Sequence, residues 1–139
     1  MLSHKKRINH VFNCLNPPLD LELWLGLGVV IIGSPCNQFG SQEPGDALQI
    51  EEFCTVNFGV TFLLTEKINV KGSEQHPLYK WLTSKELNGN KSSSVKWNFQ
   101  KYLVDNNGQL IDYYFSITKP MSSKIIKYLW PPYLLSASY

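Results

Sequence analysis

The chain has 139 residues, of which 43% are hydrophobic and 17% are charged, and its formal net charge at pH 7 is +2. This composition is ordinary for a soluble globular protein and the length suits one domain, so we expect residues 1–139 to form a single domain. A net charge this small gives no reason to expect a nucleic-acid partner or a basic membrane anchor. The longest apolar run, residues 23–33, falls short of the roughly 20 residues that a membrane span needs, so stable membrane insertion is not expected.

Three cysteines, Cys14, Cys36 and Cys54, are widely spaced along the chain. An odd number at such spacing does not indicate a disulfide framework, and the lack of a Cys-x-x-Cys pair argues against a structural zinc site. A reducing compartment fits better, so we expect a cytoplasmic protein in which each cysteine is either buried filler or a reactive thiol. No pattern indicates a metal or a cofactor, and neither is expected.

The first half of the chain predicts two buried strands with a helix between them. Residues 29–33 form an uninterrupted run rich in β-branched side chains, which suits a strand buried on both faces. Asp46 is a good helix N-cap and has Gln49 three residues on, which predicts a helix from there to about Val56. Residues 60–64 are predicted as the second strand.

The second half predicts a helix, a hairpin and a last helix. His76 and Pro77 open the first of these helices, because proline is favoured in a first turn. Asn107-Gly108 is a strong hairpin signal. The remaining assignments are a polar loop over 85–94, hairpin strands over 95–104 and 110–115, a helix over 122–129, and a tail, 130–139, without a clear period. Strands that alternate with helices and end in a hairpin predict an α/β fold with a mixed sheet and helices on its faces.

Three blocks of sequence resemble the glutathione peroxidase family. Residues 35–45, PCNQFGSQEPG, are similar almost letter for letter to a signature of that family, although the residue before its Pro, usually Phe, is Ser34 here. Residues 96–104, KWNFQKYLV, and the stretch 58–79 also resemble it. The resemblance covers about residues 29–129 and implies a thioredoxin-like fold, with a mixed central sheet flanked by helices.

The resemblance also implies a peroxidase site. In this family a cysteine or selenocysteine attacks the O–O bond of a peroxide, and the matching positions for its assisting residues are Gln42, Trp97 and Asn98. An indole N–H and side-chain amides can donate hydrogen bonds, which favour a thiolate and steady charge on the peroxide oxygens. Without the family, Trp97 and Asn98 read as ordinary core and turn residues of a strand.

Cys54 matches the resolving cysteine of family members that use thioredoxin, rather than glutathione, as reductant. Such a thiol condenses with the sulfenic acid to a disulfide that thioredoxin reopens. The alternative is a buried helix cysteine. Cys36 belongs to the signature and is either structural or an alternative partner thiol. The short loop over 85–94 resembles the monomeric branch that accepts lipid hydroperoxides, so a monomer is expected.

Cys14, in the segment 8–15, is the only residue that can be aligned with the attacking cysteine. The Gly that usually follows is Leu15, and the basic run 4–7 makes a poor buried strand where the family has its central one. The family's opening hairpin has no counterpart, so residues 1–28 are expected to be divergent or truncated. Loss of the central strand predicts an exposed sheet edge.

Two functions follow from these residues. The first is a thiol-dependent peroxidase that reduces hydrogen peroxide and organic or lipid hydroperoxides in antioxidant defence, with Cys14 attacking and Cys54 resolving. The second is a catalytically impaired family remnant, or a non-enzymatic redox sensor that uses Cys36 and Cys54.

Overall fold

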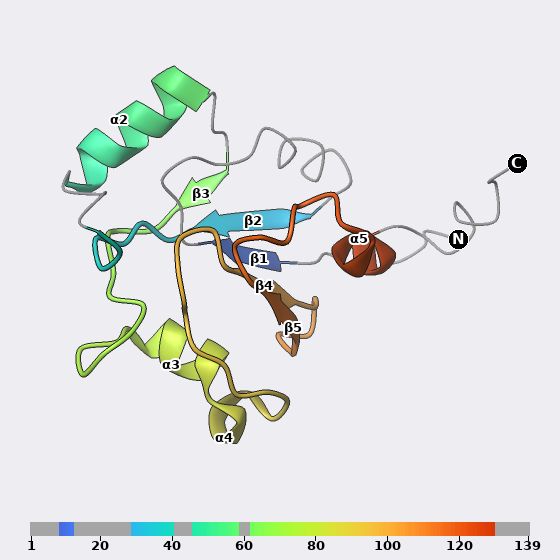
Figure 1. Ribbon diagram of the computed structural model, residues 1–139. Coiled ribbons are helices and arrows are strands. Elements are labelled where there is room, and N and C mark those ends of the chain that lie inside the picture. The colour runs from blue at the N-terminus through green and yellow to red at the C-terminus, as the bar shows by residue number, and fades with distance from the viewer. Residues whose placement is uncertain (1–8, 13–28, 41–45, 59–61, 130–139) are drawn as a thin grey trace, which may run out of the picture.

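The computed structural model describes residues 9–12, 29–40, 46–58 and 62–129 (Figure 1). For residues 9–12, 47, 54, 57 and 58 it describes the backbone alone. The predictions that the opening hairpin has no counterpart and that residues 130–139 form a tail without a period lie outside the described residues.

The described strands form one mixed sheet in the order β3-β2-β1-β4-β5. Within it β1 pairs parallel with β2 and antiparallel with β4, while β2 pairs parallel with β3 and β4 pairs antiparallel with β5. The strands are β1 (Asn9–Phe12), β2 (Val30–Gly33), β3 (Leu63–Leu64), β4 (Lys101–Val104) and β5 (Leu110–Tyr114). The α/β class and the mixed sheet are therefore confirmed.

The helices begin where local sequence signals place them. Asp46 and Gln49 exchange two hydrogen bonds of 3.0 and 2.9 Å between side chain and backbone, which is the predicted capping box. The His76 Nδ1 accepts the backbone N–H of Leu78 at 3.1 Å, ahead of Pro77. The helices are α2 (Ala47–Phe58), α3 (Pro77–Thr83), α4 (Lys85–Asn88) and α5 (Ser123–Leu129).

Consecutive residues of β4 point to opposite faces of the sheet and pack against different helices, so the sheet is covered on both faces. Tyr102 belongs to a cluster with Tyr79 and Leu82 of α3, and the rings of Tyr79 and Tyr102 meet edge to face at 6.1 Å. Leu103 belongs to a second cluster, with Ile50 of α2 and Ile125 of α5. In Figure 1, α2 and α3 accordingly lie on different sides of the sheet. Burial of both faces is the arrangement predicted from the alternation of strands and helices.

The expected loss of the central strand is wrong. Residues 9–12 form β1, which lies in the middle of the sheet with Asn9 opposite both Val30 and Val104. A strand of four residues with polar Asn9 and His10 carries a weak local pattern. Hydrogen bonds from two neighbouring strands satisfy its backbone on both sides, and that pairing is not visible in a local window.

Two assignments around the hairpin are also corrected. The polar segment 85–94 contains α4, because Lys85–Asn88 are adequate helix formers and Gly89, with φ of 76°, ends the helix in the left-handed conformation. The strand predicted over 95–104 begins only at Lys101. The Gln100 side chain accepts from the Lys96 backbone N–H at 2.9 Å and donates to the Ser94 carbonyl at 3.0 Å, so it replaces ladder hydrogen bonds.

The predicted hairpin turn is confirmed. The Gly108 N–H donates to the Asp105 carbonyl at 3.1 Å, and Gly108 has a φ of 76° that favours glycine. The Asp105 carboxylate accepts the backbone N–H groups of Asn107 and Gln109, each at 2.9 Å. Of the strand predicted over 60–64, Leu63–Leu64 is present and residues 60 and 61 lie outside the described part.

Tyr79 is fully buried and its hydroxyl is poorly satisfied. Among the described residues, neither the Tyr79 hydroxyl nor the buried Ser34 hydroxyl has a hydrogen bond of ordinary geometry. Burial raises the pKa of Tyr79 well above its usual value of 10.0, and the nearby Ser34 hydroxyl only partly opposes the rise in pKa. Within the described part of the chain, this buried hydroxyl therefore lacks a well-formed hydrogen bond.

We expect Tyr79→Phe to raise the free energy of unfolding at pH 7 by about 1 kcal/mol, because it removes an unsatisfied buried hydroxyl. The raised pKa of Tyr79 also determines how the stability of the protein changes at alkaline pH. Below pH 10 both states keep the proton, while above it the unfolded tyrosine ionises first, so Tyr79 costs about 1.4 kcal/mol of stability per pH unit there. Urea unfolding at pH 9 and pH 11 should show a smaller alkaline loss in the variant. Equal losses in both proteins would contradict this account.

Candidate functional site

Three chain segments meet at one edge of the sheet. Phe12, the last residue of β1, is opposite Gly33 at the end of parallel β2 and opposite Lys101 at the start of antiparallel β4. The chain therefore leaves β1 and β2 and enters β4 at the same edge. Ligands of α/β sheets bind outside the carboxyl ends of parallel strands, which makes this edge the candidate active site.

The signature loop and the turn before β4 contact each other at that edge. The ring of Phe39 lies 5.6 Å from the ring of Trp97, measured between centroids. Phe39 is buried with Cys36, Val70 and Tyr79 in the cluster beneath α3. Two of the sequence blocks, more than fifty residues apart in the chain, are thus brought together.

Trp97 and Asn98 lie in a tight turn rather than in a strand. Trp97 is 48% exposed, whereas the Asn98 side chain is 3% exposed. The following residue, Phe99, has a φ of 62°, a left-handed conformation that is uncommon for an aromatic residue. The carbonyl of Asn98 accepts the Ser116 hydroxyl. The exposed indole can donate its N–H to a small molecule from the solvent side, whereas the Asn98 side chain is enclosed behind it.

Gln38 holds the signature loop to residues 70 and 71. Its Oε1 accepts the backbone N–H groups of Val70 at 2.7 Å and Lys71 at 3.2 Å, and its Nε2 donates to the Lys71 carbonyl at 2.9 Å. The Lys71 ammonium lies 4.3 Å from the centroid of the Phe39 ring. These contacts fix the backbone on which Phe39 meets Trp97.

Cys36 is 3% exposed and lies in the core. Its thiol donates to the Gln38 Oε1 at 3.4 Å, and its sulfur accepts the Gln38 backbone N–H at 3.3 Å. A buried cysteine engaged in this way behaves as a structural residue, because reactive thiols are partly exposed.

The structure brings together some of the sequence-based site residues. Trp97, Asn98 and the signature loop share the edge. Cys14 and Gln42 lie outside the described residues, and Cys54 lies within α2, with its side chain outside what the structure describes. Among the residues that are described, no three His, Cys, Asp or Glu side chains are grouped so that they could hold a metal ion.

Comparison with known proteins assigns the family. The family model described as glutathione peroxidase matches residues 20–83. The glutathione peroxidase of Lactococcus lactis is 46% identical over 110 residues, which are 78% of this chain and 69% of that protein. The chain belongs to the glutathione peroxidase family.

A second relative is the glutathione peroxidase-like peroxiredoxin 2 of Saccharomyces cerevisiae, 50% identical over 95 residues. The matched part makes up 68% of this chain and 59% of the yeast protein, so the chain spans less than two thirds of the length of that relative. The crystal structure of apo Trgpx is similar with a TM-score of 0.62 and 33% identity, over 92% of this chain and 84% of that one. The fold of this glutathione peroxidase family member is therefore that of solved relatives.

Sequence reasoning named Trp97 and Asn98 as candidate donors in this family member, but it did not single out the residues that contact their turn. Phe39 lies inside the signature, and its ring contact with Trp97 depends on the sheet register. Lys101 is part of the KWNFQKYLV block, where a charged residue among apolar neighbours of a buried strand was an available signal. Ser116 follows β5 and carried no signal, since a lone serine after a strand is common.

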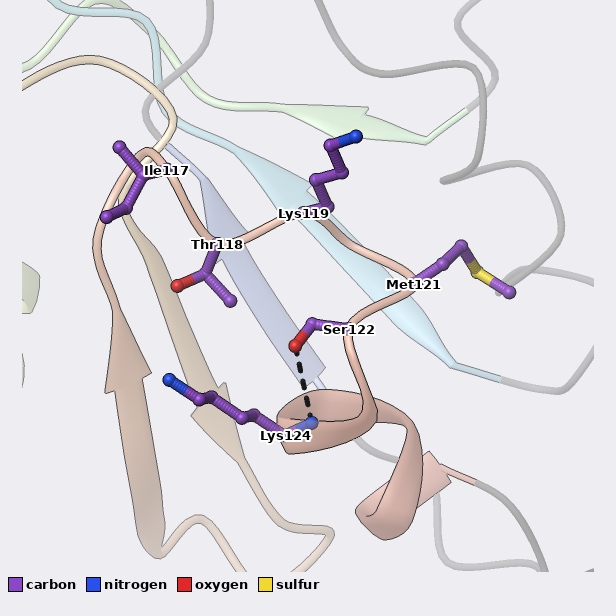
Figure 2. Close-up of a pocket in the computed structure, with 6 residues that line it drawn as sticks. All are labelled: Ile117, Thr118, Lys119, Met121, Ser122 and Lys124. Carbon is purple, nitrogen blue, oxygen red and sulfur yellow. Dashed lines mark hydrogen bonds between the residues drawn. The ribbon is translucent and has the colours of Figure 1, made fainter.

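A hollow of about 510 Å³ lies on the segment that leads into α5 (Figure 2). In Figure 2 the side chains of Lys119 and Lys124 extend in different directions, and the Ser122 hydroxyl accepts the Lys124 backbone N–H. Its described lining residues are Ile117, Thr118, Lys119, Met121, Ser122 and Lys124. Because Trp97 and Asn98 are not among them, the hollow is not assigned to the reaction of this family member.

Tyr102 lies behind the turn in a small hydrogen-bonded group. Its hydroxyl lies 3.2 Å from the Ser93 hydroxyl and accepts the Gln100 side-chain amide at 2.9 Å. Burial raises the pKa of Tyr102, and these two hydrogen bonds partly oppose the rise in pKa. Tyr102 therefore stays neutral and holds Gln100.

No helix in the described part of this family member is long and apolar enough to cross a bilayer.

Proposed function

We propose that this chain is a thiol-dependent peroxidase, in which Cys14 attacks the peroxide and Gln42, Trp97 and Asn98 assist. One observation carries the proposal: the end of β1, the signature loop after β2 and the Trp97–Asn98 turn before β4 share one edge of the sheet. Family membership supplies the chemistry that such an edge performs.

Chain connectivity supports this assignment. Cys14 follows Phe12 by two residues, so covalent geometry keeps their Cα atoms within about 7 Å. Phe12 is opposite Lys101, four residues after Trp97. Gln42 follows Gly40 by two residues, and Gly40 is next to Phe39, whose ring contacts Trp97. Chain connectivity therefore supports the proposal that all four positions belong to a single site.

The proposed reaction begins with the Cys14 thiolate. Its sulfur bonds to one peroxide oxygen as the O–O bond breaks, and the departing oxygen takes a proton to give water or an alcohol. Sulfur is oxidised by two electrons to a sulfenic acid. Donors from Trp97, Asn98 and Gln42 stabilise the thiolate and the charge that develops on oxygen.

Regeneration is proposed to use Cys54 and thioredoxin. The Cys54 thiol condenses with the sulfenic acid, which forms an S–S bond and releases water, and a thioredoxin dithiol then reduces that bond. Cys54 lies on α2, the helix that follows the signature loop, and this position supports a resolving role. Glutathione is the alternative reductant.

We infer a single-domain monomer that accepts hydrogen peroxide and organic or lipid hydroperoxides.

The sensor function that relies on Cys36 is disfavoured by the burial of that thiol. An oxidant would have to enter the core cluster around Tyr79 and Val70 to reach it. A sensor that forms a bond between Cys36 and Cys54 would need that core to open.

Thiol mapping after one equivalent of hydrogen peroxide tests the proposal. The reduced protein is oxidised, free thiols are blocked, and disulfides are identified in a digest by mass spectrometry. We expect a rapid Cys14–Cys54 disulfide. Oxidation no faster than that of free cysteine, or a Cys36–Cys54 disulfide formed first, would overturn the peroxidase proposal.

A further inference from the structure

Lys101 is a buried lysine at the candidate site. Its side chain is 1% exposed, and its ammonium donates to the carbonyl of Phe99 at 2.6 Å. Lysine is almost never fully buried unless its charge is compensated, because removal of an ammonium from water is costly. An aliphatic side chain could fill this position in β4 without that desolvation cost, so a lysine here needs a reason beyond packing.

The location of Lys101 supplies that reason. It is the first residue of β4, opposite Phe12, and its side chain reaches back to Phe99 rather than along the strand. Phe99 is the residue with a φ of 62°, in a left-handed conformation that is strained for a bulky side chain. Strain of this kind persists only where neighbouring groups fix the backbone.

Ser116 contacts the same turn from another element. Its hydroxyl donates to the carbonyl of Asn98, the residue directly before Phe99. The carbonyls of two consecutive turn residues are thus bound by side chains of β4 and of the segment after β5. Gln100 adds two hydrogen bonds on the amino-terminal side, to Ser94 and Lys96.

We propose that Lys101, with Ser116, is a positioning residue of the peroxidase site. The Lys101 ammonium holds the Phe99 carbonyl, and thereby keeps the turn in the one conformation that directs the Trp97 indole and the Asn98 amide at the reacting sulfur. Neither Lys101 nor Ser116 touches the peroxide. The inference rests on the proposed function for its catalytic consequence, but the conformation of the turn can be measured without any activity.

The variants Lys101→Met and Lys101→Arg separate charge from packing. Met fills the strand without a donor, and Arg keeps both the positive charge and the donors. We expect Lys101→Met to lower the second-order rate constant of peroxide oxidation by on the order of 10- to 100-fold, because displacement of catalytic groups by about 1 Å has effects of that size. Lys101→Arg should stay within about fivefold of the parent. The matched control, Lys96→Met, removes an exposed ammonium from the adjoining segment and should change the rate by less than about twofold.

The position of the indole is read by NMR, from the Trp97 Nε1–H resonance assigned with Trp97→Phe. The proposal expects this resonance to shift or broaden in Lys101→Met and to return towards the parent value in Lys101→Arg. A folded Lys101→Met protein with an unchanged resonance and an unchanged rate would overturn it. So would a lower rate in Lys101→Met with an unchanged Trp97 resonance.

Two further measurements keep the test decisive. If Lys101→Met does not fold, Ser116→Ala takes its place, since it removes the hydrogen bond to the Asn98 carbonyl, and an unchanged resonance and rate in that variant would overturn the proposal. If the parent itself does not react with peroxide, the proposed function fails. The resonance shift in Lys101→Met would then still support the positioning role, and its absence would refute that role too.

Discussion

Replacement of Cys14 with serine is expected to abolish thioredoxin-dependent peroxide reduction, with a fall in rate of about 10³-fold or more. The attacking group must be anionic, and a serine hydroxyl does not ionise near neutral pH, whereas a thiol with nearby donors does. Removal of a nucleophile is among the largest single losses that enzymes show. The measurement is the NADPH-linked assay with thioredoxin, thioredoxin reductase and hydrogen peroxide.

The matched control is Cys36→Ala, which removes a thiol that lies in the core. It should retain the rate within about threefold but lower the free energy of unfolding by about 1 kcal/mol, since it leaves a small cavity. A Cys14→Ser protein that keeps most of its activity would show that another residue attacks the peroxide. Loss of activity in Cys36→Ala at unchanged stability would assign that role to Cys36.

The second large effect is expected for Asn98→Ala. Its side chain is buried in the turn beside the exposed Trp97, and removal of one preorganised donor from a reacting centre costs on the order of 10²- to 10³-fold in rate. The second-order rate constant for oxidation of the protein by peroxide, followed by stopped-flow tryptophan fluorescence, should fall by about 100-fold. The later reduction by thioredoxin should change little, because it proceeds after the O–O bond has broken.

Asn88→Ala provides the same substitution at another buried asparagine. The Asn88 amide donates to the carbonyls of Trp81 at 2.9 Å and Lys91 at 2.8 Å, so it holds the loop around α4. This variant should lose about 2 kcal/mol of stability and keep its peroxide rate constant. If Asn88→Ala slowed the reaction as much as Asn98→Ala, the effect at Asn98 would reflect general loosening of the fold rather than a donor at the site.

Several elements were predictable because their signals are local. The Asp46–Gln49 capping box, the His76-Pro77 helix start and the Asn107-Gly108 turn each depend on contacts over two to four residues. Such contacts form in the same way wherever the segment lies. The signature block likewise identified the family, since its residues are adjacent in the chain.

Other features were decided by tertiary structure. The strand β1 has a weak local pattern and exists because β2 and β4 supply partners on both sides. The strand predicted from residue 95 gave way to a turn, because hydrogen bonds from Lys101 and Ser116 stabilise a backbone conformation that Phe99 disfavours by itself.

The sequence by itself therefore determined the fold class and the family, and its resemblance to the family block named Trp97 and Asn98 as candidate donors. Only the tertiary structure decided that Trp97 contacts Phe39, that Cys36 is buried, and that a lysine is enclosed behind the turn. Each of these rests on strand register, and register is fixed by pairing between segments far apart in the chain. A local pattern does not carry that information, because one slip of a strand turns its side chains to the opposite face.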